Sequence, residues 1–192
     1  MRHLKLAIEH SKGTWFGSLE DERRRLVASA LGPNPESIRG HLIAYSRRKG
    51  GPTPDIIEDG FTGLMIDLFN GLQVSVSISF NADFITPFQR RVIRVLNQIP
   101  LGKVTTYGLI ARRLDSGPRA VGGAVASNPW PLFVPCHRVV NADMTLGNYS
   151  ICGNIGRGGT VTKKALLSRE NVPIRNERVD PVALWEPSET AD

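Results

Sequence analysis

The stretch from Thr106 to Ser127 has the sequence TYGLIARRLDSGPRAVGGAVAS. Residues 106–114 have the composition of a short helix, residues 115–117 that of a turn, and Pro118 suits the first turn of a second helix. Two short helices joined by a short turn match the helix-turn-helix pattern. A helix-turn-helix is therefore predicted for this part of the chain.

The second of these helices lacks the side chains that distinguish DNA bases in the major groove. After Arg119 it holds only Ala, Val and Gly as far as residue 126, whereas base edges are contacted by Asn, Gln, Arg and Lys. Gly122 and Gly123 each cost about 1 kcal/mol relative to alanine inside a helix. Either a ligand such as a DNA minor groove approaches this helix closely, or the glycines let it pack against a neighbouring element. The pattern leaves both explanations open.

Charge is unevenly distributed along the 192 residues, whose net charge is +6. Residues 1–83 hold ten basic and ten acidic residues, 84–174 hold twelve and three, and 175–192 hold two and five. This division predicts a neutral N-terminal α/β scaffold domain (1–83), a basic C-terminal domain that binds a polyanion (84–174) and an acidic tail (175–192). DNA and a small acidic substrate would both suit the basic segment. Whether the tail is disordered or docks through Trp185 stays open.

Composition excludes several broad classes. A hydrophobic content of 41% is typical of a globular protein, and two cysteines are too few for a disulfide scaffold or a four-thiolate zinc site. No apolar run approaches the roughly 18 residues of a membrane span, and the N-terminus lacks the features of a signal peptide. We therefore expect a cytoplasmic protein with reduced thiols that does not bind a membrane.

The first eighty residues indicate mixed α and β structure without a chemical motif. We expect helices at 20–31 and 37–45, and strands at 56–61, 63–68 and 72–80. A boundary is predicted at 81–87, where Thr86 can cap a helix that begins with Pro87. The apolar positions that fall on one face of this helix are Phe88, Val92, Val95, Leu96 and Ile99.

A cysteine that could act as a nucleophile follows the short apolar run 132–134. The sequence Pro135-Cys136-His137-Arg138-Val139 sets a thiol at the end of a predicted buried strand, directly before an imidazole and a guanidinium group. Such neighbours can favour the nucleophilic thiolate. A free cysteine, however, is often buried as a small hydrophobic residue. From these residues alone, both catalysis and packing remain open.

The motif PCHRV at 135–139 resembles the O6-alkylguanine-DNA alkyltransferases, also called methylated-DNA–protein-cysteine methyltransferases. RAVGGA at 119–124, Asn128-Pro129 and GNYS at 147–150 add to the resemblance, which runs from Phe88 to about Val172. It implies an α/β (α+β) fold, with a small ribonuclease-H-like N-terminal domain and a winged-helix-like helix-turn-helix domain. It also implies a monomer that acts on double-stranded DNA without a cofactor. The implied reaction is irreversible, single-turnover transfer of the alkyl group from O6-alkylguanine, and from O4-alkylthymine, to a cysteine.

The resemblance also implies roles for individual residues. Cys136 matches the alkyl acceptor, His137 the imidazole that takes its proton through a water, and Glu170 the carboxylate that orients this histidine. Tyr107 matches the tyrosine that helps rotate the target nucleotide out of the duplex, and Arg119 the arginine that takes its place.

Further matches concern binding. Asn128 matches the hinge after the recognition helix, Val139 supplies a carbonyl for the guanine edge, and Tyr149 and Ser150 line the base pocket. The helix residues that would contact the minor groove are Arg119, Ala120, Gly122 and Gly123.

Two features depart from the family pattern. The segment 151–160 is longer than usual and rich in glycine, which indicates a mobile loop and leaves the preferred alkyl size in doubt. Cys152 lies in this segment, and a disulfide with Cys136 is one option for it. Some members carry zinc in the N-terminal domain, but no cysteine precedes Cys136 here, so we predict no metal.

Three other functions remain as alternatives. An alkyltransferase-like protein recognises the damaged base without repairing it, but such proteins lack the acceptor that Cys136 matches. A helix-turn-helix regulator would need polar base-reading side chains at 120–126, and a cysteine hydrolase would turn over repeatedly.

Overall fold

The structure is a computed structural model that describes residues 3–73, 76–152, 154–155 and 157–188. The chain divides into two compact units. The first comprises Met1–Phe84, Pro129–Phe133 and Ile151–Asn154, and the second Ile85–Asn128, Val134–Ser150 and Ile155–Asp192.

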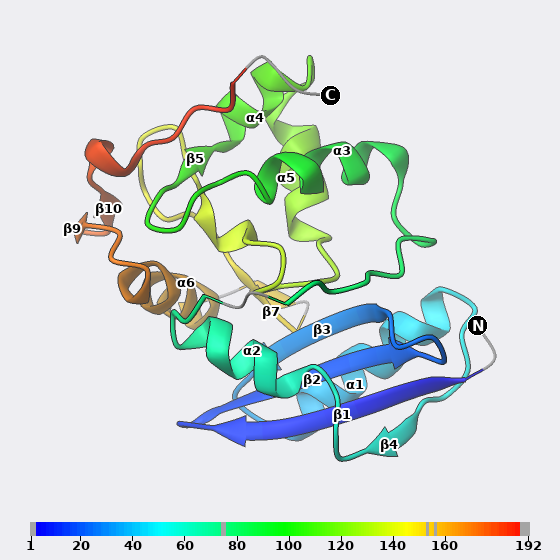
Figure 1. Ribbon diagram of the computed structural model, residues 1–192. Helices are drawn as coiled ribbons and strands as arrows, with labels where there is room; N and C mark the ends of the chain where they lie inside the picture. Colours follow the sequence, from blue (N-terminus) through cyan, green and yellow to red (C-terminus); the bar gives the residue numbers. More distant parts are fainter. Residues whose placement is uncertain (1–2, 74–75, 153, 156, 189–192) are drawn as a thin grey trace. The chain divides into compact units, whose positions relative to one another are not determined.

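A four-stranded sheet forms the centre of the first unit (Figure 1), and its strand order is β3-β2-β1-β4. Strands β1 to β3 are antiparallel, whereas β4 runs parallel to β1. The bounds are β1 (Leu4–Ser11), β2 (Thr14–Asp21), β3 (Leu26–Gly32) and β4 (Asp55–Ile57).

Two helices cover opposite faces of this sheet. They are α1 (Pro35–Arg48) and α2 (Thr62–Phe69). The Phe16 ring packs against Phe69 of α2 with 5.1 Å between ring centroids, whereas a Cβ at the next residue, Gly17, would collide with Ile38 of α1. Neighbouring residues of a strand point to opposite faces. Gly17 therefore allows α1 to lie close to the sheet.

The predicted helix at 20–31 is wrong. Its charged half forms the turn of the β2–β3 hairpin, where the Asp21 carboxylate accepts hydrogen bonds from the N–H groups of Arg23 and Arg25, both at 3.0 Å. Its apolar half is the buried strand β3. A short apolar run fits a buried strand as well as a helix, and pairing with β2 decides between them.

The other N-terminal predictions have mixed outcomes. The helix at 37–45 is confirmed within α1, but 63–68 is helical in α2, and only the beginning of 56–61 is a strand. Val74 and residue 75 lie outside the described residues; of 72–80, only Phe80 makes a bridge, to Leu26.

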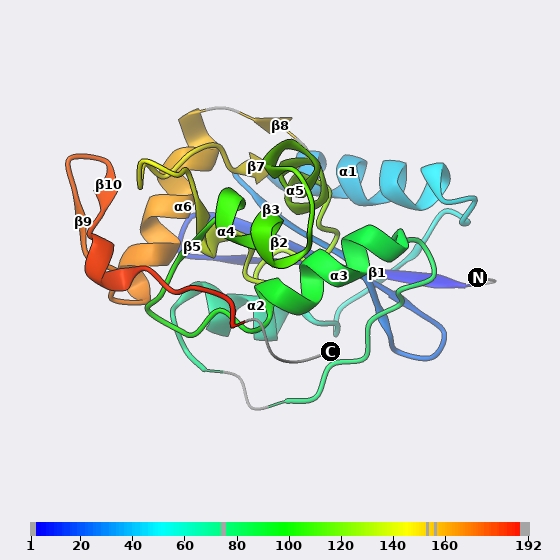
Figure 2. The same cartoon turned by 90° about the horizontal axis from the view of Figure 1, so that it is seen from above.

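The second unit contains the predicted helix-turn-helix. Helix α4 (Tyr107–Arg113) follows the cap residue Thr106, and α5 (Pro118–Ala126) starts with the predicted proline. Helix α3 (Pro87–Leu96) begins with a capping box between Thr86 and Gln89, as local sequence signals indicated. Helices α3 and α4 both pack against α5 (Figures 1 and 2). None of the described helices is long and apolar enough to cross a membrane.

The chain beyond residue 173 completes the core of the second unit. It forms a hairpin of β9 (Ile174–Arg175) and β10 (Arg178–Val179), followed by a short 3₁₀ turn. The buried residues of this core are Val104, Val140, Leu146, Leu167, Val172, Val179 and Ala183. Residues 175–188 of the predicted acidic tail lie among the described residues, and backbone hydrogen bonds, including one from the Trp185 N–H to the Val104 carbonyl at 2.7 Å, join them to the rest of the unit.

Replacing Val179 by alanine should lower the free energy of unfolding by about 2 kcal/mol, because it removes two methyl groups from a closed core. Val179 is 1% exposed and Val182 is 69% exposed, so Val182→Ala is the matched control. Urea denaturation measures both changes. Equal stability of the two variants would show that the tail is not part of the core.

Candidate active site

One turn of 3₁₀ helix, Cys136–Arg138, carries the cysteine, histidine and arginine of the PCHRV motif. Strand β6 (Val139–Val140) follows it and pairs in parallel with β5 (Thr105–Thr106). The predicted buried strand at 132–134 is wrong. Leu132 adopts a left-handed φ of 75°, and the prolines that flank this run supply no N–H for a strand ladder.

His137 and Arg138 both bind the carboxylate of Glu170. His137 Nε2 lies 2.8 Å from Glu170 Oε1. Arg138 binds the same carboxylate through two nitrogens: Nε donates to Glu170 Oε2 at 2.8 Å, and Nη2 donates to Glu170 Oε1 at 2.9 Å. Its third nitrogen, Nη1, donates to the Ile99 carbonyl at 2.7 Å. Burial alone would raise the pKa of Glu170, but the hydrogen bonds and charges of His137 and Arg138 outweigh it and lower this pKa to about 2. Glu170 is therefore ionised at neutral pH.

Glu170 is positioned by the end of helix α6 (Arg157–Arg169). The N–H groups of Glu170, Asn171 and Val172 bind carbonyls of the last helical turn. Asn171 adopts a left-handed φ of 60°, a conformation that asparagine tolerates better than most residues. The helix thus ends where Glu170 meets the 3₁₀ turn of the motif.

The ionised Glu170 determines which nitrogen of His137 carries the proton. A carboxylate only accepts hydrogen bonds, so Nε2 is protonated and Nδ1 keeps a lone pair. Nδ1 is buried and has no hydrogen-bond partner among the described residues. Burial, together with the charges of Arg138 and Lys163, lowers the pKa of His137 against the opposing effect of Glu170. The ring is therefore neutral at pH 7 and able to accept a proton.

Cys136 is 7% exposed, and burial raises the pKa of its thiol. Four interactions oppose that effect: a hydrogen bond from the Asn128 side chain, the charge of Lys163, a hydrogen bond from the Tyr149 hydroxyl, and a hydrogen bond from the backbone of Cys136 itself. Asn128 Nδ2 also donates to the Val134 carbonyl at 3.2 Å, which fixes the amide. The buried Tyr149 hydroxyl makes no other hydrogen bond in the described part of the chain.

Lys163 is a site residue that the sequence motifs do not indicate. It has no exposed surface, and its Nζ donates to the Val139 carbonyl at 2.6 Å, which leaves that carbonyl one further lone pair. Burial lowers the pKa of Lys163 to about 8, so the ammonium keeps its proton at pH 7. One signal was available: Lys163 lies two helical turns before Glu170 and so on the same helix face.

The other residues that the resemblance assigns to nucleotide rotation or to the base pocket lie in the same unit. Tyr107 is half-buried, and burial together with the nearby Cys136 raises the pKa of its phenol, which keeps its proton at neutral pH. Ser150 is also half-buried and begins β7 (Ser150–Ile151). Gly159 of α6 lies so close to the Tyr149 carbonyl that a Cβ there would collide with it.

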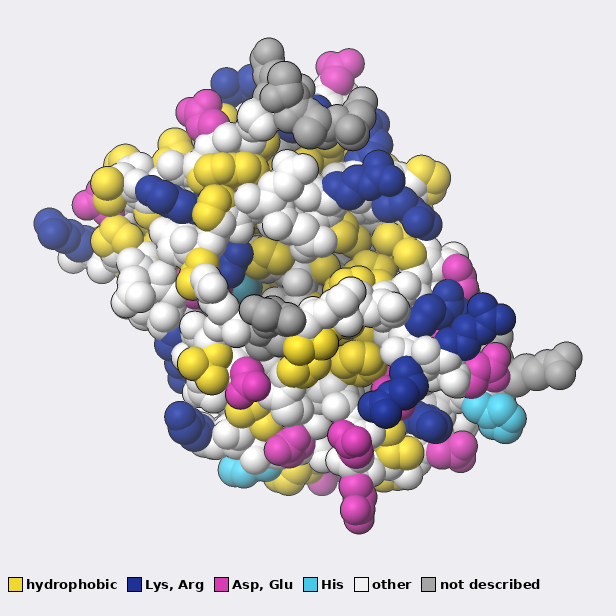
Figure 3. All heavy atoms as spheres, viewed as in Figure 1, with side chains coloured by type: hydrophobic (Ala, Val, Ile, Leu, Met, Phe, Trp, Pro, Cys, Tyr) yellow, Lys and Arg dark blue, Asp and Glu magenta, His cyan; other side chains and the backbone are white. Residues whose placement is uncertain are grey.

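Helix α5 carries the residues predicted to contact the minor groove, and Tyr107, the other predicted DNA-binding residue, begins α4. Arg119, Ala120 and Gly123 are exposed, and Gly122 is half-buried. A Cβ at either glycine would meet no described atom within 4 Å, so packing against a neighbour does not account for them. Figure 3 shows Lys and Arg side chains grouped over α3, on the same unit as α5. The exposed basic residues of α3 are Arg90, Arg91 and Arg94.

The segment after Ser150 differs from the predicted glycine-rich loop. Strands β7 and β8 (Asn154–Ile155) pair, and α6 already includes the glycines at 158 and 159. Cys152 belongs to the first unit, where its thiol donates to the Leu31 carbonyl at 3.3 Å, and burial raises its pKa to about 11. Both cysteines are free. Among the described residues, no three His, Cys, Asp or Glu side chains gather as metal ligands.

Comparison with known proteins agrees with these observations. Residues 87–172 match the family model described as "6-O-methylguanine DNA methyltransferase, DNA binding domain". The methylated-DNA–protein-cysteine methyltransferase of Thermococcus kodakarensis is 45% identical over 166 residues, which cover 82% of this chain and 89% of that protein. The relative from Methanothermobacter thermautotrophicus is 40% identical over 92 residues, 48% of each chain.

Solved structures give the same result. The O6-methylguanine-DNA methyltransferase of Pyrococcus kodakaraensis superposes with a TM-score of 0.70 at 29% identity, covering 88% of this chain and 99% of that one. The Mycobacterium tuberculosis O6-methylguanine methyltransferase, in a crystal structure with DNA, gives a TM-score of 0.62 at 28% identity, covering 86% and 92%.

The chain therefore belongs to the methylated-DNA–protein-cysteine methyltransferase family. Its match spans about half the length of several curated relatives and most of the length of the Thermococcus kodakarensis protein. The mixed α/β fold predicted from the sequence is confirmed.

Replacing Lys163 by methionine should raise the pKa of Cys136, because the substitution removes the buried positive charge that favours the thiolate. The rate of Cys136 alkylation by iodoacetamide, followed from pH 5 to 10, should fall at pH 7 and reach its midpoint at a higher pH. Lys164→Met is the control, since Lys164 is exposed and paired with Glu177. Superimposable pH profiles for the two variants would contradict the role of Lys163.

Proposed function

We propose that this protein repairs DNA by transferring the alkyl group of O6-alkylguanine to Cys136, once per molecule and irreversibly. One observation carries the proposal: the buried Cys136 thiol and a neutral His137 lie in the same 3₁₀ turn. The protonated Nε2 of His137 donates a hydrogen bond to the ionised Glu170. The names of the relatives support the same reaction. It uses groups of the chain and of the DNA, together with a water molecule.

The reaction begins when Cys136 loses its proton, through a bridging water, to Nδ1 of His137. Glu170 stabilises the imidazolium that results. The thiolate attacks the alkyl carbon in line, so that an S–C bond forms while the C–O6 bond breaks and its electron pair passes to O6. Tyr107 donates a proton to the departing guanine and regains one from His137. In the net reaction, the Cys136 thiol loses one proton and the guanine gains one.

The product explains why the protein acts once. A thioether has no carbonyl carbon for water to attack, so Cys136 is not regenerated, in contrast to the thioester of a cysteine hydrolase. The same displacement applies to O4-alkylthymine, whose alkyl carbon is also bonded to an exocyclic oxygen.

The target nucleotide must leave the duplex before reaction, because an alkyl group inside a base pair cannot reach a thiol that is 7% exposed. Arg119 fills the gap, and the small residues of α5 clear the walls of the minor groove. Asn128, Val139, Tyr149 and Ser150 then contact the extruded base. Phosphate contacts by exposed basic residues supply affinity that does not depend on sequence.

We interpret the first unit as ribonuclease-H-like and the second as a winged-helix-like helix-turn-helix domain. The sheet order β3-β2-β1-β4 supports the first assignment, and helices α4 and α5 support the second.

Incubation with duplex DNA containing O6-methylguanine tests the proposed reaction. We expect one methyl group per protein molecule, mapped by mass spectrometry to Cys136, with no further turnover in excess DNA. Cys136→Ser should abolish transfer and retain DNA binding. Cys152→Ser is the matched control and should react like the wild type. Methylation of Cys152, or repeated turnover, would refute the proposal.

Gly122→Ala and Gly123→Ala should each increase the stability of the protein and decrease its affinity for duplex DNA. Each should stabilise α5 by about 1 kcal/mol, because an added Cβ meets no described atom and alanine favours helix. Each should also weaken binding to duplex DNA by about tenfold, or 1.4 kcal/mol, because the Cβ obstructs approach to the groove.

Thermal unfolding and fluorescence anisotropy measure the two effects. Gly40→Ala in α1 is the control, since Gly40 is also an exposed helical glycine in open space. It should add stability without changing DNA affinity. Unchanged affinity in the α5 variants would argue against a groove-facing α5.

A further inference from the structure

The end of the chain pairs with the segment that leads to Tyr107. The Val104 N–H donates to the Ala183 carbonyl at 2.9 Å, and the Trp185 N–H donates to the Val104 carbonyl at 2.7 Å. Val104 and Leu184 thus form a parallel bridge. The tail residues lie beyond the matched family model, which ends at residue 172.

This bridge extends a backbone arrangement that contains the proposed reacting groups. Val104 directly precedes β5, whose last residue, Thr106, caps α4 by accepting a hydrogen bond from the Leu109 N–H at 3.2 Å. Tyr107 is the first residue of α4. On its other side, β5 pairs with β6, which directly follows the turn that carries Cys136. The tail is therefore the third strand-like segment beside β5 and β6.

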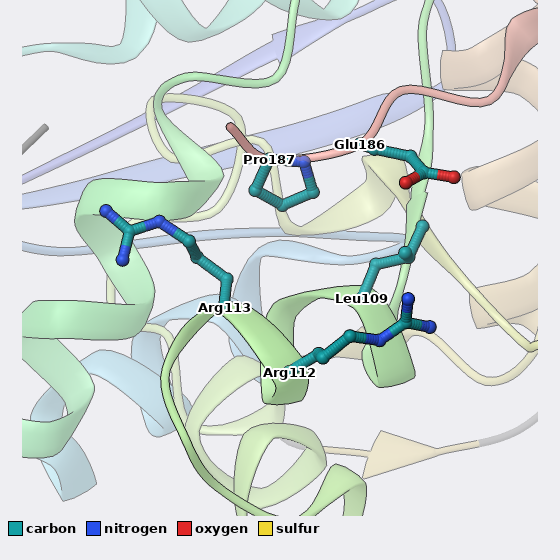
Figure 4. Close-up of a pocket in the computed structure, with 5 residues that line it drawn as sticks. All are labelled: Leu109, Arg112, Arg113, Glu186 and Pro187. Atoms are coloured by element: carbon teal, nitrogen blue, oxygen red, sulfur yellow. The ribbon is translucent and has the colours of Figure 1, made fainter. Parts of the chain in front are cut away.

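The tail then reaches helix α4. Glu186 and Pro187 line a cavity of about 380 Å³ together with Leu109, Arg112 and Arg113 of this helix. Figure 4 shows the Pro187 ring between the helix side chains, whereas the guanidinium groups of Arg112 and Arg113 point to opposite sides. Because these two groups do not converge, the cavity lacks the geometry of an anion site. Its lining instead places the tail beside α4, because Glu186 and Pro187 face the same cavity as three side chains of that helix.

A further tail contact involves Lys103. Its Nζ donates to the Val182 carbonyl at 2.9 Å, one residue before Val104. The segment 182–187 therefore binds Lys103 and Val104, shortly before Tyr107, and lines a cavity together with the helix that begins at Tyr107.

We propose that residues 183–187 are a positioning element for Tyr107. They hold Val104, the residue before β5, by backbone pairing and lie beside α4, and so fix the direction in which the phenol meets the target nucleotide. The inference rests on the proposed role of Tyr107 in nucleotide rotation. It assigns a role to the tail in repair of duplex DNA, in addition to its contribution to the core.

Trp185→Pro tests the backbone pairing, because proline removes the N–H that binds Val104. Leu184 has φ −65° and ψ 132°, the extended conformation that a residue before proline adopts, so the substitution suits the local backbone. Trp185→Ala is the matched control, since it removes the side chain and keeps the N–H. Val179→Ala controls for lost stability.

The readout is the ratio of two alkyl-transfer rates, one with duplex DNA containing O6-methylguanine and one with free O6-benzylguanine. Only the duplex requires nucleotide rotation. Trp185→Pro should slow the duplex reaction about tenfold and the free-base reaction less than about threefold. Tyr107→Ala should shift the ratio in the same direction, whereas Trp185→Ala and Val179→Ala should leave it unchanged.

Equal slowing of both reactions by Trp185→Pro, or no slowing of either, would overturn the inference. A chain that ends at residue 185 provides a second test, because it keeps the pairing with Val104 and removes Glu186 and Pro187 from beside α4. It should show a smaller shift of the ratio in the same direction, and an unchanged ratio would count against a role for these two residues. Failure of the wild type to react with both substrates would instead refute the proposed function.

Discussion

The carboxylate of Glu170 joins three segments that are distant in sequence. It lies at the end of α6, receives His137 and Arg138 from the 3₁₀ turn, and through Arg138 is connected to the Ile99 carbonyl beyond the end of α3. Burying a single carboxylate would be unfavourable, and only its complete pairing lowers the Glu170 pKa to about 2. The same pairing fixes the His137 tautomer. Structure and chemistry therefore depend on one interaction.

Two charged groups act on the thiol in different ways: Lys163 of α6 and Glu170, the residue that directly follows this helix. Glu170 acts through His137, which it keeps as a neutral ring with an available lone pair. Lys163 acts directly, because its buried ammonium favours the Cys136 thiolate. Since both residues lie on one helix face, the position of α6 sets both effects, and Gly159 permits its close approach to the Tyr149 backbone. In the described part of the chain, burial is what shifts the pKa of Cys152, raising it to about 11, and this keeps Cys152 a thiol at neutral pH.

Local signals predicted some parts of the fold and not others. Helices α3 to α5 follow from caps, prolines and apolar spacing, all of which act within a few residues. The runs 20–31 and 63–68 were misassigned because a short apolar segment becomes strand or helix according to what it packs against. The proposed roles of His137 and Glu170 came from motif resemblance, since no local rule joins residues so far apart. Lys163 was missed because its burial depends on the carbonyl of Val139, which only the folded chain brings to it.

The protonation state of His137 tests this account most directly. Nitrogen-15 NMR of the imidazole, recorded from pH 5 to 8, distinguishes the two neutral tautomers from the imidazolium. The account predicts a neutral ring at pH 7, protonated at Nε2 and unprotonated at Nδ1. A proton on Nδ1, or an imidazolium at pH 7, would contradict it, because neither form can accept the proton of Cys136.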